Sequence, residues 1–261
     1  MFQASVIASG SKGNCLLVQS DQAAVLFDVG ISARRVWQAL DNLGIPRKKL
    51  DAVVVSHEHS DHIKGAGAVA RLQQVPIFIT DETFCHCERK LGDLRGRIKY
   101  FESGKGFRIG DLFIHPFSSP HDAVDSCNFT VRQDGNEEAK LAIATDVGYA
   151  SKLVVKHLMD ATTLVLESNH DEILLKEGPY PWDVKQRISS RQGHLSNVQA
   201  VGVISQIMHQ RLKLLVLAHL SEINNTPDHA RIEMERYLRN IRSDLQLIVA
   251  EQNTHTPLFN I

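Results

Sequence analysis

Short apolar runs rich in valine, isoleucine and leucine recur along the chain, separated by turns rich in glycine, aspartate and serine. Runs of this length between turn signals are typical of buried strands. In the first half they predict strands at Phe2–Ala8, Cys15–Gln19, Ala24–Phe27, Leu50–Val55, Pro76–Thr80, Ile98–Phe101, Phe107–Ile109 and Leu112–Phe117. In the second half they predict strands at Asn128–Arg132, Lys140–Thr145, Thr163–Leu166, Leu212–Ala218 and Leu245–Val249, the last being the final strand.

Amphipathic stretches that begin at a capping residue predict helices between these strands. Ser32 is the expected N-cap of a helix that runs to about Leu43, with Gly44 as its stop. The other predicted helices are Ala66–Leu72, one capped by Asp81, Ser151–Leu158, Pro181–Arg191, Ser196–His209 and one that begins at Thr226 and ends near Ile241. Strands followed by interleaved helices in each half predict an α/β fold, a four-layer αββα sandwich of two mixed β-sheets. We expect residues 1–261 to form a single domain of this kind.

Composition narrows the class of protein but not its function. Of the 261 residues, 43% are hydrophobic and 23% are charged, which is ordinary for a globular protein. The formal net charge of −1 gives no overall electrostatic argument for nucleic acid or membrane as a partner. Met1–Val6 does not resemble a signal peptide, and no apolar run is long enough to cross a bilayer. We therefore expect a cytoplasmic protein with no membrane partner.

The segment Ser56–His62 directly follows the strand predicted at Leu50–Val55 and is dense in possible metal ligands. These are His57, His59, Asp61 and His62. In an extended segment the first two project to the same side, because side chains alternate with a period of two. The other two lie past the strand end and can turn toward a neighbouring position. One segment could therefore supply ligands to two adjacent ions, which a polar loop with surface histidines explains less well.

Three more possible ligands, His121, Asp146 and His219, each follow a predicted strand. Alone, each is better explained as a polar residue that ends a strand. Because the same placement recurs, we expect the side chains to converge on one edge of a sheet.

The order H-x-H-x-D-H, then His, then Asp, then His resembles the metallo-β-lactamase superfamily. The resemblance implies a hydrolase with two divalent ions, zinc or manganese, and a bridging hydroxide as the nucleophile. It also implies that Asp61 helps to orient this nucleophile and that Asp28 supports the histidine segment from behind. The implied ligands are His57, His59 and His121 for one ion, Asp61, His62 and His219 for the other, and Asp146 between them.

Two further segments bear on the substrate, Glu167–Asp171 and Gly193–Asn197. In the second, His194 precedes a helix that Ser196 could cap, and a helix start offers backbone N–H groups to a phosphate. With the turn Ser9–Asn14, these segments most closely resemble the YycJ/WalJ-type exonuclease family. This resemblance implies a phosphodiesterase that degrades double-stranded DNA from the 5′ end. His194 would then bind the scissile phosphate or protonate the leaving oxygen, and Ser196 and His170 are further candidates for substrate binding.

Two alternatives remain open. A small-molecule hydrolase, acting on cyclic phosphodiesters, thiolesters or lactones, would use the same ligands. A metal-loaded protein that binds nucleic acid without cleaving it is the non-enzymatic alternative. The basic clusters that could contact DNA are Arg34 and Arg35, Arg47–Lys49, and Lys185 with Arg187 and Arg191. Most such clusters are solvated helix faces, so they do not decide between these readings.

Overall fold

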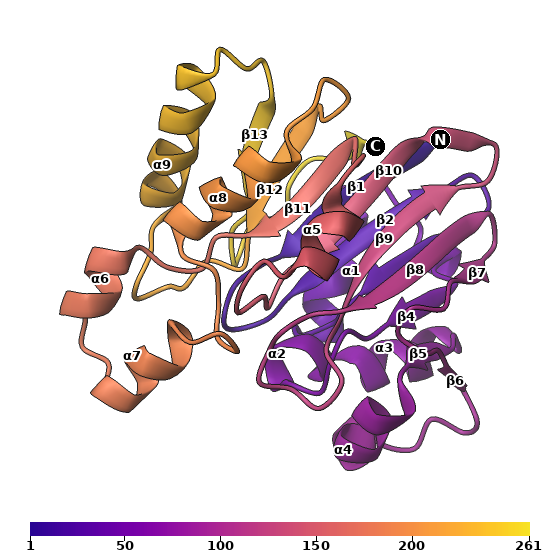
Figure 1. Ribbon diagram of the computed structural model, residues 1–261. Helices are drawn as coiled ribbons and strands as arrows, with labels where there is room; N and C mark the ends of the chain where they lie inside the picture. The colour runs from indigo at the N-terminus through magenta and orange to yellow at the C-terminus, as the bar shows by residue number, and fades with distance from the viewer.

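The computed structural model describes residues 1–261 and contains two seven-stranded β-sheets packed face to face (Figure 1). The first sheet has the order β14-β1-β2-β3-β4-β5-β6 and the second β13-β12-β11-β10-β9-β8-β7. The strands of the first are β1 (Phe2–Ala8), β2 (Cys15–Ser20), β3 (Ala24–Phe27), β4 (Ala52–Val54), β5 (Ile77–Ile79), β6 (Ile98–Tyr100) and β14 (Phe259–Asn260). Those of the second are β7 (Phe107–Ile109), β8 (Leu112–Ser118), β9 (Cys127–Gln133), β10 (Asn136–Ala144), β11 (Thr163–Glu167), β12 (Leu214–Ala218) and β13 (Gln246–Val249).

Each sheet is antiparallel in one part and parallel in the other. Strands β1 to β3 form an antiparallel meander, whereas β3 to β6 are parallel. The second sheet repeats this scheme, with β7 to β10 antiparallel and β10 to β13 parallel. Tight turns suffice to join antiparallel neighbours, but parallel neighbours need a crossover, which is usually a helix. Both sheets are therefore mixed, as the alternation of strands and helices predicted.

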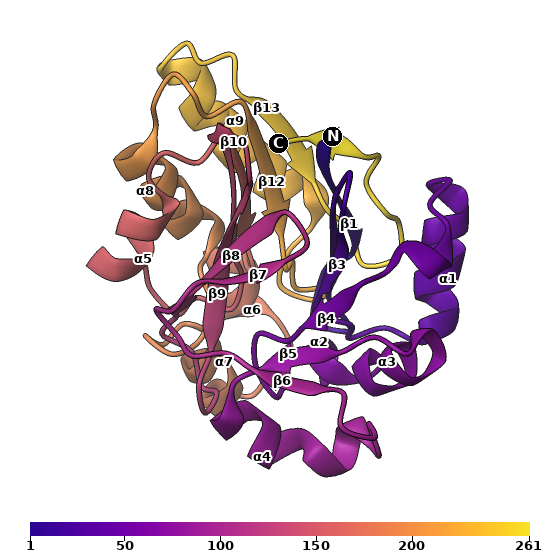
Figure 2. The same cartoon turned by 90° about the vertical axis from the view of Figure 1, so that its right-hand side faces the viewer.

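Three apolar clusters divide the molecule into four layers, and Figure 2 shows these layers edge-on. The central cluster lies between the sheets, where the rings of Phe27 and Phe129 approach to 5.2 Å between centroids. The other two lie between each sheet and its outer helices. The helices on the first sheet are α1 (Ala33–Asn42), α3 (Ala66–Gln73) and α4 (Asp81–Leu91), and those on the second are α5 (Lys152–Leu158), α8 (Asn197–Ile207) and α9 (Pro227–Asn240). The four-layer prediction is confirmed, and none of the helices combines the length and apolarity that a membrane crossing requires.

Some predicted boundaries were wrong for local reasons. Thr80, not Asp81, caps α4, because Thr80 is extended and its hydroxyl accepts a hydrogen bond from the amide of Thr83. The last strand is β14, which pairs with β1, and not the strand near Leu245–Val249. Three short helices were not predicted, since one or two turns carry too little periodicity to be recognised. They are α2 (Ser60–Ile63), α6 (Glu172–Glu177) and the 3₁₀ helix η1 (Arg47–Lys49). Helix α7 (Trp182–Ile188) was predicted but is shorter than expected.

In each sheet, the strands that precede the candidate ligands run in the same direction. The loops after β1, β3 and β4 therefore leave one edge of the first sheet, and those after β8, β10 and β12 leave one edge of the second. Several hydrogen bonds join these loop sets. The amide of His219 donates to the Ser9 hydroxyl at 2.6 Å, and the amide of Cys127 donates to the Ser56 carbonyl at 3.2 Å. The fold thus brings the candidate site residues of both sheets to one place.

Candidate metal centre

The predicted ligands gather in compact groups at this shared edge. Within each group, one nitrogen or oxygen of every member lies within 4.8 Å of those of the others. The groups are His57, His59 and His121; Asp61, His62 and His219; and His57, His62 and Asp146, and a fourth joins Asp146 and His219 to Glu167 and His194. The first two are the two sets of three that the resemblance implied, and the third places Asp146 beside both.

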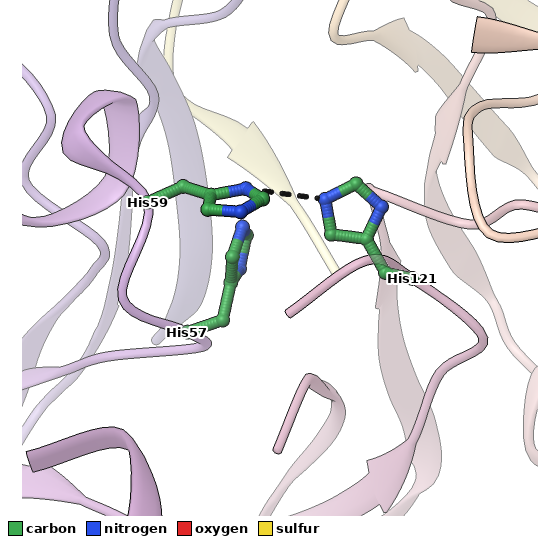
Figure 3. Close-up of side chains that lie close together, drawn as sticks. All are labelled: His57, His59 and His121. Atoms are coloured by element: carbon green, nitrogen blue, oxygen red, sulfur yellow. Dashed lines mark hydrogen bonds between the residues drawn. The ribbon is translucent and has the colours of Figure 1, made fainter. Parts of the chain in front are cut away.

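The first group joins the two sheets. Figure 3 shows His57 and His59 projecting from the loop after β4 toward His121, which follows β8. His59 Nδ1 lies 3.3 Å from His121 Nε2, and His121 Nδ1 donates to the carbonyl of Gly193 at 3.2 Å. His57 Nε2 is buried and has no hydrogen-bond partner. Burial lowers the pKa of His57 well below its usual value, which keeps the imidazole neutral.

Asp146 lies between the groups and is buried. Its Oδ2 is 3.1 Å from His62 Nε2 but makes no hydrogen bond, and its Oδ1 is 3.6 Å from His121 Nε2. Buried polar atoms nearly always have a partner, so an unpartnered carboxylate oxygen beside the unpartnered His57 nitrogen requires an explanation. A cation between these groups would satisfy both atoms.

The short helix α2 carries Asp61 and His62, and Asp28 holds it in place. The Asp28 carboxylate accepts hydrogen bonds at 2.8 Å from the amide and hydroxyl of Ser56 and from His62 Nδ1. Burial alone would lower the pKa of His62, but the carboxylates of Asp146, Asp28 and Asp61 outweigh it and hold that pKa well above the usual value. Asp28 therefore has the supporting position that the resemblance implied.

Three residues of the site have a left-handed backbone, which is uncommon for side chains other than glycine. They are Asp28, Asp146 and His219, with φ of 56°, 56° and 57°, and each lies at the end of a strand. Strained conformations of this kind persist where the surrounding structure enforces them, and they cluster at functional sites. Here the sharp turn at the strand end aims each side chain across the edge of the sheet.

The turn Ser9–Asn14 braces the site through its side chains. Asn14 Nδ2 lies 3.2 Å from both Asp61 Oδ2 and His62 Nε2, and Asn14 Oδ1 accepts from the amide of Gly10. The Ser9 hydroxyl holds the backbone of His219. Sequence reasoning singled out this turn but did not assign a role to either residue.

Glu167, the last residue of β11, is a buried carboxylate that the sequence analysis did not place in the site. Its Oε1 accepts hydrogen bonds at 2.8 Å from the Nδ1 atoms of both His194 and His219. Its two oxygens also accept from the amides of Asp146, Val147 and Leu195. Burial opposes ionisation, but the two histidines outweigh it and lower the pKa of Glu167 to about 2. An acid at the end of an apolar strand was the signal that could have identified it.

His194 lies at the mouth of this arrangement, with 18% of its side chain exposed. Its Nδ1 donates to Glu167, whereas its Nε2 makes no hydrogen bond within the protein. Burial works against protonation, but the adjacent Glu167 carboxylate outweighs it and raises the pKa of His194. The ring is thus fixed from one side and free on the other.

The two other candidates for substrate binding are buried. The Ser196 hydroxyl caps α8, accepting from the amide of Gln199, and donates to Glu172 at 2.9 Å. His170 pairs with Ser196 in an isolated β-bridge, and burial lowers its pKa to about 4. This helix start offers fewer free N–H groups than we expected, because the amides of Leu195, Ser196, Asn197 and Gln199 have partners within the protein.

Comparison with known proteins gives this centre its context. Residues 8–175 match the family described as the Metallo-beta-lactamase superfamily. The chain belongs to the metallo-beta-lactamase superfamily. It is a metal-dependent hydrolase.

Relatives within the superfamily match nearly the whole chain. It is 34% identical to Exodeoxyribonuclease YycJ of Bacillus anthracis, over 90% of this chain and 88% of that protein. It is 32% identical to Exodeoxyribonuclease WalJ of Streptococcus pneumoniae strain D39, over 100% of this chain and 98% of that protein. The structure of the metallo-beta-lactamase fold protein YhfI from Bacillus subtilis shares the fold, with a TM-score of 0.72, 18% identity and coverage of 98% and 99%.

The basic clusters that could contact DNA lie at different places relative to the metal centre. Arg47 forms an ion pair with Asp41 on the surface away from the metal centre. Arg187 instead forms an ion pair with Asp122, the residue after His121, and so ties α7 to the centre. Lys185 and Arg187, which lie on α7, are therefore held near the site.

Replacing Gly30 with alanine is expected to disrupt the metal centre. A Cβ atom at Gly30 would overlap with the carbonyl group of Asp61. Hydrogen bonds fix both segments, because the Gly30 amide donates to the Asn14 carbonyl and the carbonyls of Asp61 and His62 accept from the amides of Asn14 and Val29. Overpacking of this kind costs about 3 kcal/mol, and relief requires α2 to move. We expect a lower melting temperature and weaker metal binding, measured by thermal unfolding with and without added metal.

Gly202 provides the matched control, because a Cβ atom there meets no other atom within 4 Å and the residue lies within α8. Gly202→Ala should leave metal binding unchanged and stabilise the helix slightly. If Gly30→Ala binds metal as tightly as the unaltered protein, the close packing of Gly30 on Asp61 does not support the site.

Proposed function

We propose that the protein is a two-metal phosphodiesterase that removes nucleotides from the 5′ end of DNA. The observation that carries the proposal is the pair of three-residue ligand groups with the buried Asp146 carboxylate beside both. His57, His59 and His121 would hold one ion, Asp61, His62 and His219 the other, and Asp146 would bridge them.

The donor set fits divalent cations. The unpartnered atoms His57 Nε2 and Asp146 Oδ2 lie within one group of ligand atoms, where a cation would satisfy both. Five imidazoles and two carboxylates without a thiolate suit zinc or manganese. Ions bound here would supply an activated water near neutral pH and would stabilise the negative charge that develops on the phosphoryl group.

The chain's own residues complete the chemistry. Glu167 accepts from His194 and fixes the ring, leaving Nε2 free to face a substrate. A protonated imidazole in this position can donate its Nε2 proton to the leaving oxygen, the role of a general acid. The carboxylate of Asp61, held by Asn14, would orient the attacking water.

Two facts support DNA as the substrate. The relatives that match nearly the full chain are named exodeoxyribonucleases. In addition, Lys185 and Arg187 lie on α7, which the ion pair with Asp122 ties to the centre. Cationic groups beside the site suit the phosphate backbone of a nucleic acid.

The test is to assay the manganese- and zinc-loaded protein on duplex DNA labelled at either end, on bis-p-nitrophenyl phosphate and on a thiolester. Early release of labelled mononucleotide from the 5′-labelled strand is expected, with activity abolished by a chelator and restored by one of the two metals. Fast turnover of the thiolester without cleavage of DNA would refute the proposal. Early release from the 3′ label would refute the polarity alone.

A further inference from the structure

A cavity of about 360 Å³ opens beside the metal centre, between α6, α7 and the start of α8. Its size lies at the lower end of the range for small-ligand sites, which suits one nucleotide. Figure 1 shows α6 and α7 as a pair of short helices set apart from the two sheets. The residues that line it are His170, Glu172, Leu175, Lys176, Trp182, Lys185, Gln186, Ser189 and Gln199.

The charge of the cavity favours an anion. Lys176 makes no ion pair, and Lys185 uses one N–H to donate to the carbonyl of Lys176 at 2.7 Å, which leaves two donors free. The one carboxylate in the wall, Glu172, already accepts a hydrogen bond from Ser196. Two ammonium groups thus face a single, partly satisfied carboxylate, and a phosphate monoester is the anion that this arrangement suits.

The remaining wall offers a stacking surface and an unused hydrogen-bonding atom. Trp182 is 69% exposed, which is unusual for an indole unless it contacts a partner. Nucleobases of any sequence stack on such rings. His170 is 2% exposed, and its Nδ1 is buried without a hydrogen-bond partner. A ligand in the cavity could satisfy this atom.

The cavity is connected to the metal centre through a short stretch of backbone. His170 forms a β-bridge with Ser196, two residues after His194, and His194 contacts the centre through Glu167. A DNA strand with its scissile phosphate at the centre must place its terminal nucleotide beyond that phosphate. His194–Ser196 runs between the centre and His170, which lines the cavity.

We propose that this cavity binds the 5′-terminal nucleotide of a DNA strand, with the terminal phosphate on Lys176 and Lys185 and the base on Trp182. The inference rests on the proposed function, because only an exonuclease needs to hold a terminal nucleotide. Because the cavity has room for a single nucleotide, the enzyme would remove one nucleotide at a time from the 5′ end.

The test uses Lys176→Gln and Trp182→Ala, with Lys156→Gln on the exposed face of α5 as the matched control. Binding of thymidine 5′-monophosphate and of thymidine is measured by calorimetry, without turnover. Loss of one charged hydrogen bond should weaken binding of the monophosphate by about 10-fold in Lys176→Gln and leave thymidine unaffected. Trp182→Ala should weaken both ligands, and Lys156→Gln neither.

A kinetic measurement separates this inference from the proposed function. The unaltered enzyme should prefer 5′-phosphorylated over 5′-hydroxyl duplex DNA by about 10-fold, and Lys176→Gln should lose the preference while still hydrolysing bis-p-nitrophenyl phosphate. DNA cleavage with no effect of Lys176→Gln on preference or binding would overturn the cavity's role but not the exonuclease. If Lys176→Gln loses the same fraction of its activity on DNA and on bis-p-nitrophenyl phosphate, Lys176 acts at the metal centre. That result would also overturn the proposed role of the cavity. Lys176-dependent binding of the monophosphate without any DNA cleavage would support the site and refute the exonuclease.

Discussion

Replacing Asp146 with asparagine is expected to remove most of the bound metal and to reduce hydrolysis by about 1000-fold or more. Asp146 is the buried carboxylate that lies beside both ligand groups, with oxygens 3.1 Å from His62 Nε2 and 3.6 Å from His121 Nε2. Without the negative charge of Asp146, one fewer carboxylate would balance the two bound cations in this buried site, so both would bind more weakly. Metal-derived charge stabilisation is worth several kcal/mol of barrier, and each 1.36 kcal/mol is a factor of ten in rate.

Asparagine is the appropriate substitute because of the backbone. Asp146 has φ of 56°, a conformation that asparagine tolerates and that would strain alanine. Asp160 supplies the control, since it has φ of 62° and its carboxylate forms only an exposed ion pair with Arg211. Asp160→Asn should keep full metal content and activity. Metal content is measured by elemental analysis of the dialysed proteins, and a full complement in Asp146→Asn would refute the bridging role.

The fold could be predicted because its signal is local. Each buried strand needs a run of apolar residues, and each helix of three or more turns needs a cap and an apolar face, as Ser32 and Thr226 illustrate. Features that depend on tertiary contacts were missed. Strand β14 is two residues long and exists only because β1 offers it an edge. Helix α2 has four residues and is held by Asp28 rather than by its own propensity.

The ligand residues could be predicted for a similar reason, since they follow strand ends in a dense and ordered pattern. Their supports could not. Glu167 ends an apolar strand and Asn14 ends a glycine-rich turn, but the function of both depends on which loops meet across the two sheets. The same limit applies to the α6–α7 cavity, whose walls come from three helices and whose depth no sequence pattern encodes. The sequence therefore predicts the metal ligands of the site better than it predicts the residues that hold those ligands in place.

Glu167 gives the site a property that separate ligands would not have. One oxygen of this carboxylate accepts from His219, a proposed ligand, and from His194, the proposed acid. A change at either histidine alters the hydrogen bonding of the other. We therefore expect substitutions at Glu167 and His194 to be non-additive, as is usual for residues that share a partner.

Replacing His194 with alanine is expected to leave the metal content unchanged and to cut DNA hydrolysis by about 100-fold or more, as loss of a general acid does. The ring is held by Glu167 through Nδ1, and its Nε2 has no partner within the protein. The defect should depend on the leaving group. Bis-p-nitrophenyl phosphate releases a stable phenolate that needs no proton, so its turnover should fall far less than that of DNA.

His86→Ala is the matched control, because this histidine is exposed on α4 and bonds only to the carbonyl of Glu82. It should match the unaltered protein in metal content and in turnover of both substrates. If His194→Ala loses metal together with activity, His194 is a ligand and not the acid. If both substrates slow by the same factor while the metal remains, His194 binds the scissile phosphate and does not protonate the leaving oxygen, since only proton donation responds to the leaving group.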